Sequence, residues 1–432
     1  MPRPDAVPGD ALPGRADVVV IGAGVAGIST ALELAERGLS VVVCDKGVVA
    51  GEQSSRNWGW VRQMGRDPRE LPLMRVSIGL WRQMRQRTGA ETGFRECGIA
   101  YLCRNERQME RRRRWHADHA GTHGLRTRVL SASEAQALTP GATIRWTGGL
   151  LTPDDARAEP TLAVPAMARA AQRRGARIVQ RCAVRTLERS GGRVRGVVTE
   201  KGPVATERVV LAGGAWSRHF AFNEGVDLPQ LAVVNSVLRT APFEAPIAHS
   251  LAGAGFAIRR RLDGGWTVAH SDINVADLVP DSFRLLSDFR HLAGEFRDYR
   301  LRLGPRFARE ARMPRRWTAD EQSPFEGERV RDPTHVPRVL DAAWRNLRTA
   351  LPVFEQARVA ERWAGAIDVT PDAVPMIGPI ARVPGLFVLT GLSGHGFGLG
   401  PGAGRLLAQM MEGEAACVDP TPFRPERFRR MR

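Results

Sequence analysis

A glycine-rich run near the start of the sequence has the spacing of a phosphate-binding turn. Its three glycines form the pattern G-x-G-x-x-G: Gly22, Gly24 and Gly27. A Val-rich strand is expected before them over 17–21, then a helix, then a second strand over 39–44 that ends at Asp45. Such glycines permit a tight turn and close approach to a pyrophosphate, and the acid bonds ribose hydroxyls. The pattern predicts a dinucleotide site without a 2′-phosphate, and a glycine-rich turn that binds nothing is the alternative.

A second glycine-rich turn lies near the end of the sequence. It follows an expected strand over 386–390 and precedes a helix that runs through Gln409. Four glycines expose backbone N–H groups at the helix start: Gly391, Gly394, Gly396 and Gly398. Such a helix end favours negative charge, as on the N1/C2 oxygen edge of a reduced flavin. A tight structural turn is the alternative interpretation.

The elements between these turns distinguish one class of dinucleotide from another. An NAD-binding domain usually continues as alternating strands and helices, but here a polar and aromatic stretch follows over 53–60. Strand-like segments return only at 176–179, 194–199 and 208–211. A chain that leaves the sheet and returns is typical of an interrupted, FAD-type fold. An NAD-dependent dehydrogenase is the alternative.

Length and composition limit the class of protein. The 432 residues suffice for two or three domains, and 43% hydrophobic with 25% charged residues is typical of a globular protein. Five cysteines without a spaced pattern exclude a disulfide framework and a zinc ribbon. No secretory signal or membrane-spanning run is apparent, so we expect a cytoplasmic protein.

The charge is strongly basic, with 63 Lys and Arg against 46 Asp and Glu and a net charge of +17. Only Lys46 and Lys201 are lysines. Such an excess could attract nucleic acid, an acidic membrane surface or an anionic substrate, or it could be a solvated surface. Aromatic residues do not alternate with the basic run 111–114, so no nucleic-acid partner is predicted. The basic tail 416–432 could touch the inner face of a membrane, or it could be a frayed terminus.

Together these segments resemble the D-amino-acid oxidase, glycine oxidase and sarcosine oxidase group of FAD-dependent amine oxidoreductases. The resemblance covers roughly residues 16–411 and rests on ordered blocks: 18–46, 54–57, 148–160, 209–217, 363–378 and 394–397. It implies an α/β fold in which a Rossmann-like FAD-binding domain is interleaved with a mainly antiparallel α+β substrate domain. The substrate sheet would use strands over 98–103, 231–239, 256–261 and 266–270.

The resemblance also implies domain boundaries. The FAD-binding domain would comprise 16–95, 150–225 and 360–415, and the substrate domain 96–149 and 226–359. Residues 1–15 would form a flexible segment before them.

The same resemblance assigns cofactor contacts to matched positions. Gly22, Gly24 and Gly27 would hold the pyrophosphate, and Asp45 with Lys46 would lie at the adenosine ribose. The pyrophosphate and ribityl chain would contact Ser54, Ser55, Arg56 and Asn57, with Gly59 close by. Val184 would touch the adenine. The isoalloxazine would be lined by Gly213, Gly365, Gly394, Gly396, Phe397 and Gly398.

Some positions depart from the family pattern. Trp58 and Trp60 stand where small residues are usual, and they form either an aromatic wall over the substrate or part of the core. Sarcosine-oxidase-like members place a lysine where this chain has Gly398, so sarcosine is disfavoured and oxidase behaviour stays open. The stretch 363–378 has no cysteine to attach a flavin, so noncovalent FAD is expected.

The expected reaction oxidises the C–N bond of an amino acid or an N-substituted amino acid. Hydride passes to flavin N5 and the imine hydrolyses, which needs no triad or metal. Oxygen or another acceptor, such as a quinone, would reoxidise the flavin. An arginine fork would bind the substrate carboxylate: Arg62 is the first candidate, with a surface or phosphate-binding role as its alternative, and Arg259 or Arg260 the next. His395 would bond the flavin or hold its loop. A basic, non-catalytic binding protein is a further alternative.

Overall fold

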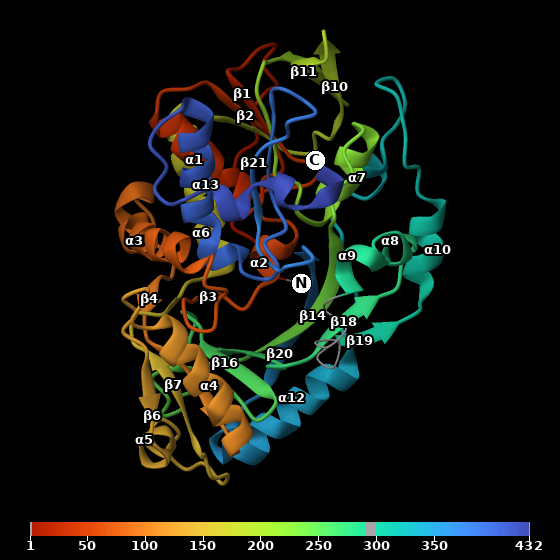
Figure 1. Cartoon of the computed structure of the whole chain (residues 1–432). Helices are drawn as coiled ribbons and strands as arrows, with labels where there is room; N and C mark the ends of the chain where they lie inside the picture. The colour runs from red at the N-terminus through yellow and green to blue at the C-terminus, as the bar shows by residue number, and fades with distance from the viewer. Residues whose placement is uncertain (1, 291–298, 432) are drawn as a thin grey trace.

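The computed structural model describes residues 2–290 and 299–431, so parts of the predicted ranges 1–15, 226–359 and 416–432 lie outside it (Figure 1). The chain passes repeatedly between two large sheets. The first has six strands in the order β21 (Met376–Pro379), β22 (Leu386–Thr390), β13 (Val209–Leu211), β1 (Val18–Ile21), β2 (Val41–Cys44) and β9 (Arg177–Val179). All neighbours in it are parallel except β21 and β22.

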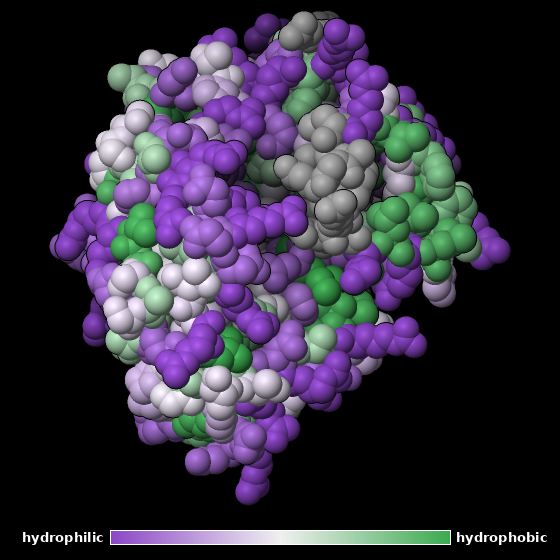
Figure 2. Space-filling model, turned by 60° about the horizontal axis from the view of Figure 1, so that its bottom comes forward, coloured by the Kyte–Doolittle hydropathy of each residue, from purple (hydrophilic) through white to green (hydrophobic). Residues whose placement is uncertain are grey.

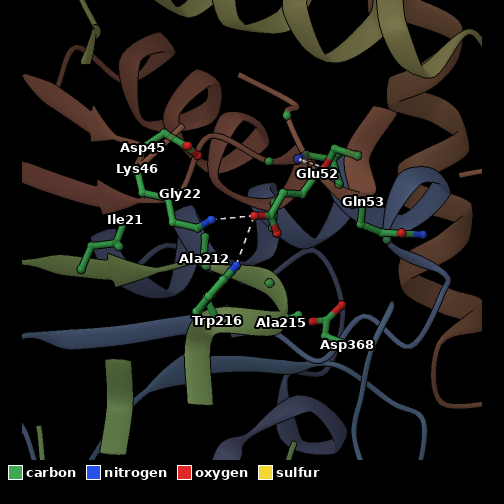
Figure 3. A pocket seen from close by; sticks show the side chains of 18 of the residues that line it. Ile21, Gly22, Asp45, Lys46, Glu52, Gln53, Ala212, Ala215, Trp216 and Asp368 are labelled. Carbon is green, nitrogen blue, oxygen red and sulfur yellow. Dashed lines mark hydrogen bonds and ion pairs between the residues drawn. The ribbon is translucent and has the colours of Figure 1, made fainter. Parts of the chain in front are cut away.

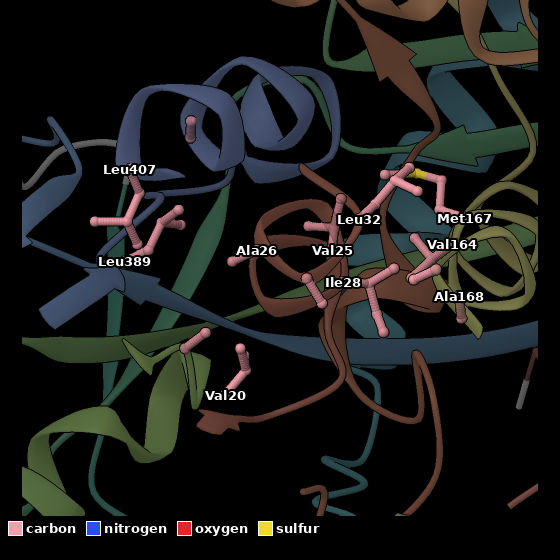
Figure 4. Packing of buried hydrophobic residues seen from close by; sticks show 14 of the residues in the cluster. Val20, Val25, Ala26, Ile28, Leu32, Val164, Met167, Ala168, Leu389 and Leu407 are labelled. Carbon is pink, nitrogen blue, oxygen red and sulfur yellow. The ribbon is translucent and has the colours of Figure 1, made fainter. Parts of the chain in front are cut away.

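Three long helices pack together on one face of this sheet. Helix α1 (Val25–Glu36) lies between α6 (Pro160–Arg173) and α13 (Gly396–Glu412), as Figure 4 shows. Ile28 and Leu32 of α1 are fully buried in that layer. Strand β1 contributes to both faces, since Val18 and Val20 join this cluster whereas Val19 faces the other side. The alternation is that of a strand buried on both faces.

The opposite face of the six-stranded sheet is covered by a small antiparallel sheet. Its strands are β10 (Val184–Ser190), β11 (Arg193–Thr199) and β12 (Gly202–Ala205). Val184, Val197 and Val204 of these strands pack in one cluster with Val19 and Val209. The six-stranded sheet is therefore covered on both sides.

The second large sheet has ten strands and is mainly antiparallel. Its order is β19 (Tyr299–Arg302), β18 (Asn274–Asp277), β14 (Leu231–Thr240), β17 (Trp266–Ala269), β16 (Phe256–Arg260), β15 (Ser250–Gly253), β5 (Ile99–Cys103), β7 (Gly148–Thr152) and β6 (Arg128–Leu130), and β20 (Val359–Val369) pairs with β14. Helix α12 (Pro337–Ala350) packs against it through Leu340 and Leu347. The strands predicted in this part of the sequence are confirmed.

Shorter elements connect these layers. The remaining helices are α2 (Gln53–Arg56), α3 (Leu71–Thr88), α4 (Glu106–His119), α5 (Ala132–Ala137), α7 (Ser217–Asn223), α8 (Pro280–Arg284), α9 (Leu286–Phe289), α10 (Pro305–Arg312) and α11 (Pro324–Gly327). A second small sheet has the order β3 (Trp60–Val61), β8 (Ala156–Arg157) and β4 (Arg95–Glu96). Single 3₁₀ turns occur at Gly214–Trp216, Pro352–Gln356, Thr421–Phe423, Pro425–Arg427 and Arg429–Met431.

Two of the predicted ranges make contacts that their assignment did not include. Residues 360–415 were assigned to the cofactor-binding part, but β20 pairs along its length with β14 of the ten-stranded sheet. Within the segment predicted to be flexible, Asp10 accepts hydrogen bonds from Gln172 of α6 and from the N–H of Ile178 in β9. Both sets of contacts join partners that are remote in sequence.

The basic tail 416–432 also packs on the molecule. Phe423 is buried, and Arg427 is paired with Asp372 at 3.0 Å. Arg430 bonds both Asp227 and Asp288. These arginines are therefore neutralised within the chain, and the predicted membrane contact of the tail stays a prediction.

Hydrophilic residues cover most of the face seen in Figure 2. Hydrophobic residues gather at the right of that face, and α8, α10 and β19 lie on the same side in Figure 1. The large hydrophobic residues exposed in that region are Phe283, Leu286, Leu301 and Leu303. Among the described residues, none of the helices has the length and apolar character required to cross a bilayer.

A buried ion pair joins the two large sheets. Glu159, at the start of α6, bonds both Nη atoms of Arg259 on β16 at 2.6 and 3.2 Å. The two side chains are only 4% and 1% exposed. Arg259 also donates Nε–H to the carbonyl of Trp58. Removing one partner of such a pair leaves the other charge buried and uncompensated.

We therefore expect Glu159→Ala to lower the free energy of unfolding by about 3–5 kcal/mol in urea titrations. The matched control is Arg82→Ala, which breaks the exposed pair of Arg82 with Glu96 and should cost less than about 1 kcal/mol. Equal losses for the two variants would contradict a special role for the buried pair.

Candidate active site

A deep cavity opens between the two glycine-rich turns at the carboxyl ends of β1 and β13 (Figure 3). It encloses about 1220 Å³ of space between atoms, solvent at its mouth included. Eleven of the predicted cofactor residues line it: Gly22, Gly24, Asp45, Lys46, Ser54, Asn57, Val184, Gly213, Gly394, Gly396 and Phe397. The structure thus brings residues from five parts of the sequence to one cavity.

The first glycine turn owes its shape to close backbone contacts. Gly22 has φ of 105°, and a Cβ there would lie 2.5 Å from the carbonyl oxygen of Ala212. A Cβ on Gly27 would overlap the carbonyl oxygen of Gly22. Gly27 does not line the cavity, but it allows α1 to begin directly behind the turn. At that helix start, the N–H of Val25 is bonded to the hydroxyl of Ser54 at 2.8 Å.

Asp45 is held rigidly at the edge of the cavity. Its Oδ2 accepts the N–H of Ala23 at 2.6 Å and its Oδ1 the N–H of Gly47 at 2.7 Å. Burial raises the pKa of this carboxyl, whereas the two backbone N–H groups act to lower it. The arrangement presents an oriented acceptor to a ligand hydroxyl.

Glu52 is a cavity residue that the sequence did not indicate. Figure 3 shows it between Lys46 and Trp216, and it accepts hydrogen bonds from Lys46 Nζ at 2.6 Å and Trp216 Nε1 at 3.2 Å. Lys46 also lies 4.5 Å from the centre of the Trp216 ring. Lys46 therefore has its charge partner within the cavity wall.

A segment remote in sequence completes this end of the cavity. Phe325, Arg329 and Val330 line it, and Lys46 donates to the carbonyls of Glu328 and Arg329. No sequence pattern pointed to this segment, because its contacts join residues about 280 positions apart.

Asp368 organises the second glycine turn. This buried carboxylate on β20 accepts the N–H of Gly391 at 2.7 Å and that of Leu392 at 3.3 Å. Gln230 also donates to it at 3.1 Å. Burial raises its pKa, against the effect of these hydrogen bonds. An acid directly after the apolar run 363–367 was the signal in the sequence that could have indicated it.

Six predicted cofactor residues lie outside the cavity lining. Arg56 is buried, forms an ion pair with Asp332 at 3.1 Å and donates a hydrogen bond to the carbonyl of Arg331. It therefore holds the segment 325–332 rather than lining the cavity. The other five lie behind the cavity wall and contact neighbouring residues: Gly27 lies against Gly22, Ser55 donates to the carbonyl of Glu52, Gly59 lies against Ala158, Gly365 against the Gln53 side chain and Gly398 against Val61.

Trp58 and Trp60 form an edge-to-face pair with ring centres 5.3 Å apart. Trp58 donates its Nε1–H to Asn235 of β14 at 2.9 Å. Trp60 is 8% exposed, and its Nε1 has no hydrogen-bond partner among the described residues. Neither ring lines the main cavity, so an aromatic wall over the substrate stays a prediction.

The three arginines predicted to bind a carboxylate have different partners in the structure. Arg62 is half-buried over the ring of Tyr101 and donates to the carbonyl of Met64. Arg259 is corrected as a carboxylate anchor, because Glu159 and the Trp58 carbonyl occupy its guanidinium. Arg260 points the other way by strand alternation and pairs with exposed Glu244.

His395 lies between two glycines of the cavity wall. Its Nδ1 is 3.0 Å from Oε2 of Glu70, which is fully buried. Burial, and then the charge of Arg66, lower the pKa of His395. At neutral pH the residue is therefore an uncharged imidazole whose Nδ1–H is directed at Glu70, and its position within the glycine turn is fixed from outside.

The comparison with protein families now decides the assignment. The model described as FAD dependent oxidoreductase matches residues 17–410. The chain belongs to this FAD-dependent oxidoreductase family. The predicted family and cofactor are confirmed, and the protein is an enzyme.

Solved and curated relatives agree with the family. The L-amino acid deaminase of Proteus myxofaciens, solved with anthranilate, is 37% identical, with a TM-score of 0.94 and coverage of 99% of this chain and 97% of that one. Glycine oxidase of Pseudomonas aeruginosa is 27% identical over 94% of this chain and 98% of its own length. 4-Methylaminobutanoate oxidase (formaldehyde-forming) of Paenarthrobacter nicotinovorans is 26% identical over 97% of this chain, which spans 46% of that longer protein.

The cavity fits FAD on structural grounds. Gly22 and Gly24 line the cavity without side chains, as close approach to a pyrophosphate requires, and Asp45 presents carboxylate oxygens for ribose hydroxyls. Gly394 and Gly396 supply backbone at the start of α13, a favourable position for negative charge. In this FAD-dependent oxidoreductase, each end of the cavity thus has donors and acceptors of the required kind.

Asp155 supports the segment that carries Arg62. This fully buried carboxyl accepts the N–H groups of Gln63 at 2.7 Å and Met64 at 3.3 Å. Burial raises its pKa to about 7, although Arg62 and Arg66 act against the rise. The folded protein therefore keeps a proton that the unfolded chain releases near pH 4.

We expect the free energy of unfolding to fall as the pH rises from about 4 to 7, by an amount of the order of 4 kcal/mol from this group alone. Asp155→Asn should lack that part of the slope in urea titrations at several pH values. Asp154→Asn, which changes the neighbouring partner of Arg126, is the control and should keep it. Parallel slopes for parent and Asp155→Asn would refute the assignment.

Proposed function

We propose that this enzyme oxidises the α C–N bond of an L-amino acid with a free amino group, releasing a 2-oxo acid and ammonia after hydrolysis. The observation that carries the proposal is the 37% identity to an L-amino acid deaminase, with nearly full coverage of both chains and a TM-score of 0.94. The relatives named for N-methylated substrates or glycine are 26–27% identical.

The arrangement of the sheets supports separate roles in binding the cofactor and the substrate. We infer that the six-stranded sheet with its helices binds FAD, and that the ten-stranded sheet forms the substrate side. Strand β20 serves both, because it pairs with β14 and also carries Asp368 below the second glycine turn. Bound FAD supplies the hydride acceptor.

The chain's own residues position the reactants and require no acid or base from a triad. Asp368 fixes the glycine turn, and Glu70 fixes His395 within it. Trp58 is held by Asn235, which in turn bonds Asn274 at 2.9 Å on the neighbouring strand. These contacts connect the cofactor side of the site with the ten-stranded sheet.

Anaerobic bleaching of the flavin absorption band tests this function. We expect L-amino acids to bleach it and to yield one 2-oxo acid per flavin reduced, whereas D-amino acids and N-methylglycine leave the colour unchanged. Bleaching by N-methylated amino acids alone, with formaldehyde as product, would overturn the proposal in favour of demethylation. Return of colour in air identifies oxygen as acceptor, and persistence until a quinone analogue is added identifies a quinone.

We further propose that FAD is bound noncovalently. Of the described residues that line the cavity, Cys44 is the one cysteine, and it adjoins Asp45. A hydrogen bond with Cys182 and burial raise the pKa of the Cys44 thiol well above its usual range, so it stays protonated and a poor nucleophile.

Acid precipitation should therefore release all yellow colour into the supernatant, with the mass of FAD. Colour retained in the washed pellet would contradict noncovalent binding.

A further inference from the structure

Arg66 is a buried cation without a carboxylate partner. Arg66 is 5% exposed, and its Nη1 atom has no hydrogen-bond partner among residues 2–290 and 299–431. Its Nε–H is bonded to the carbonyl of Arg62 at 3.1 Å. Burial lowers the pKa of Arg66 to about 9, so the guanidinium is still charged at neutral pH.

Other buried guanidinium groups in this chain are paired. Arg259 lies on Glu159, and Arg218 on Asp227 and Asp281, all at 2.6–2.7 Å. An unpaired buried charge lowers stability, and such a cost is characteristic of functional sites. Arg66 therefore differs from the arginines whose role is to hold elements together.

A second unsatisfied donor lies in the same region. The buried Nε1–H of Trp60 has no partner in the described part of the chain, and the Trp60 ring is 6.3 Å from that of Tyr101. The guanidinium groups of Arg62 and Arg112 lie 5.2 and 4.3 Å from the same Tyr101 ring. Neither of these two arginines is within ion-pair distance of a described carboxylate. Among the described residues, the region thus offers donors and positive charge without a carboxylate in a direct ion pair.

Backbone and side-chain contacts place this cluster beside the cavity wall. A Cβ on Gly398 would lie 3.4 Å from the carbonyl oxygen of Trp60, and Glu70, four residues after Arg66, is bonded to His395 between Gly394 and Gly396 of the wall. Glu70 is already bonded to His395, and Asp155 to the backbone of the segment after Arg62. Neither acid therefore compensates Arg66 by a direct ion pair.

We propose that Arg66 and the indole N–H of Trp60 form the subsite that binds the carboxylate of the substrate, with Arg62 contributing charge from its rim. The inference rests on the proposed function, since it assigns the recognition of an amino acid to residues of that site. A carboxylate matches this subsite because it accepts several hydrogen bonds and neutralises a guanidinium.

Equilibrium binding of benzoate, followed by the change in the absorption of bound flavin, tests the subsite without turnover. We expect Arg66→Met to raise the Kd for benzoate about ten- to hundredfold, the cost of losing hydrogen bonds to a charged group. Trp60→Phe should raise it less. Benzamide, which lacks the charge, should bind parent and Arg66→Met equally weakly.

A stability measurement separates this role from a structural one. Because Arg66 is buried without an ion-paired carboxylate among the described residues, Arg66→Met should leave the Tm of the ligand-free holoenzyme unchanged or raise it. Arg259→Met, the paired control, should lower Tm. Unchanged benzoate affinity in Arg66→Met would overturn the proposal, as would a lowered Tm together with equal losses for benzoate and benzamide.

Two further observations keep the test decisive. Arg66→Lys retains the charge and should stay within about tenfold of the parent, which guards against misfolding of the methionine variant. If no L-amino acid bleaches the parent, the proposed function fails, whereas the benzoate comparison still tests the subsite. If L-amino acids bleach both proteins and benzoate binds both equally, the subsite fails and the function stands.

Discussion

The close approach of α1 to β1 is the contact on which the rest of this site depends. Gly27 places the helix against the carbonyl of Gly22, and Gly22 in turn lies against the carbonyl of Ala212. A side chain at either glycine would separate three backbone segments. The resulting turn points the start of α1 into the cavity and sets Asp45 beside it, so that one dense packing arrangement forms both the turn predicted to hold the pyrophosphate and the edge predicted to meet the ribose.

The second half of the site is formed by strands that belong to both sheets. Strand β20 extends along β14, and its Asp368 holds the N–H groups of the turn that follows β22. The Glu159–Arg259 pair joins α6 to β16 near Trp58. These connections fix the relative position of the two sheets more strictly than either sheet could alone, and the proposed binding of cofactor and substrate by different sheets depends on that position.

Arginine serves two different purposes in this molecule. Most of the buried guanidinium groups described above are neutralised by carboxylates, as at Arg259 and Arg218, and thereby connect segments. The tail arginines Arg427 and Arg430 are also paired within the chain. Part of the excess of positive charge is thus internal structure rather than a surface for partners. Arg66 lacks such a pairing, which is the physical reason to assign it to a ligand.

The sequence by itself determined the strand, turn and helix around Gly22 and the acid at Asp45, because local steric demands and strand periodicity act over a few residues. It also determined the FAD-dependent family. It could indicate that one of Arg259 and Arg260 faces inward, but not that Arg259 is paired there with Glu159. Only the tertiary structure decided that Glu52, Asp368 and the segment 325–332 complete the cavity, and that Arg66 has no ion-paired carboxylate among the described residues. Those features depend on contacts between segments up to about 280 residues apart, and no local pattern encodes which distant groups a fold brings together.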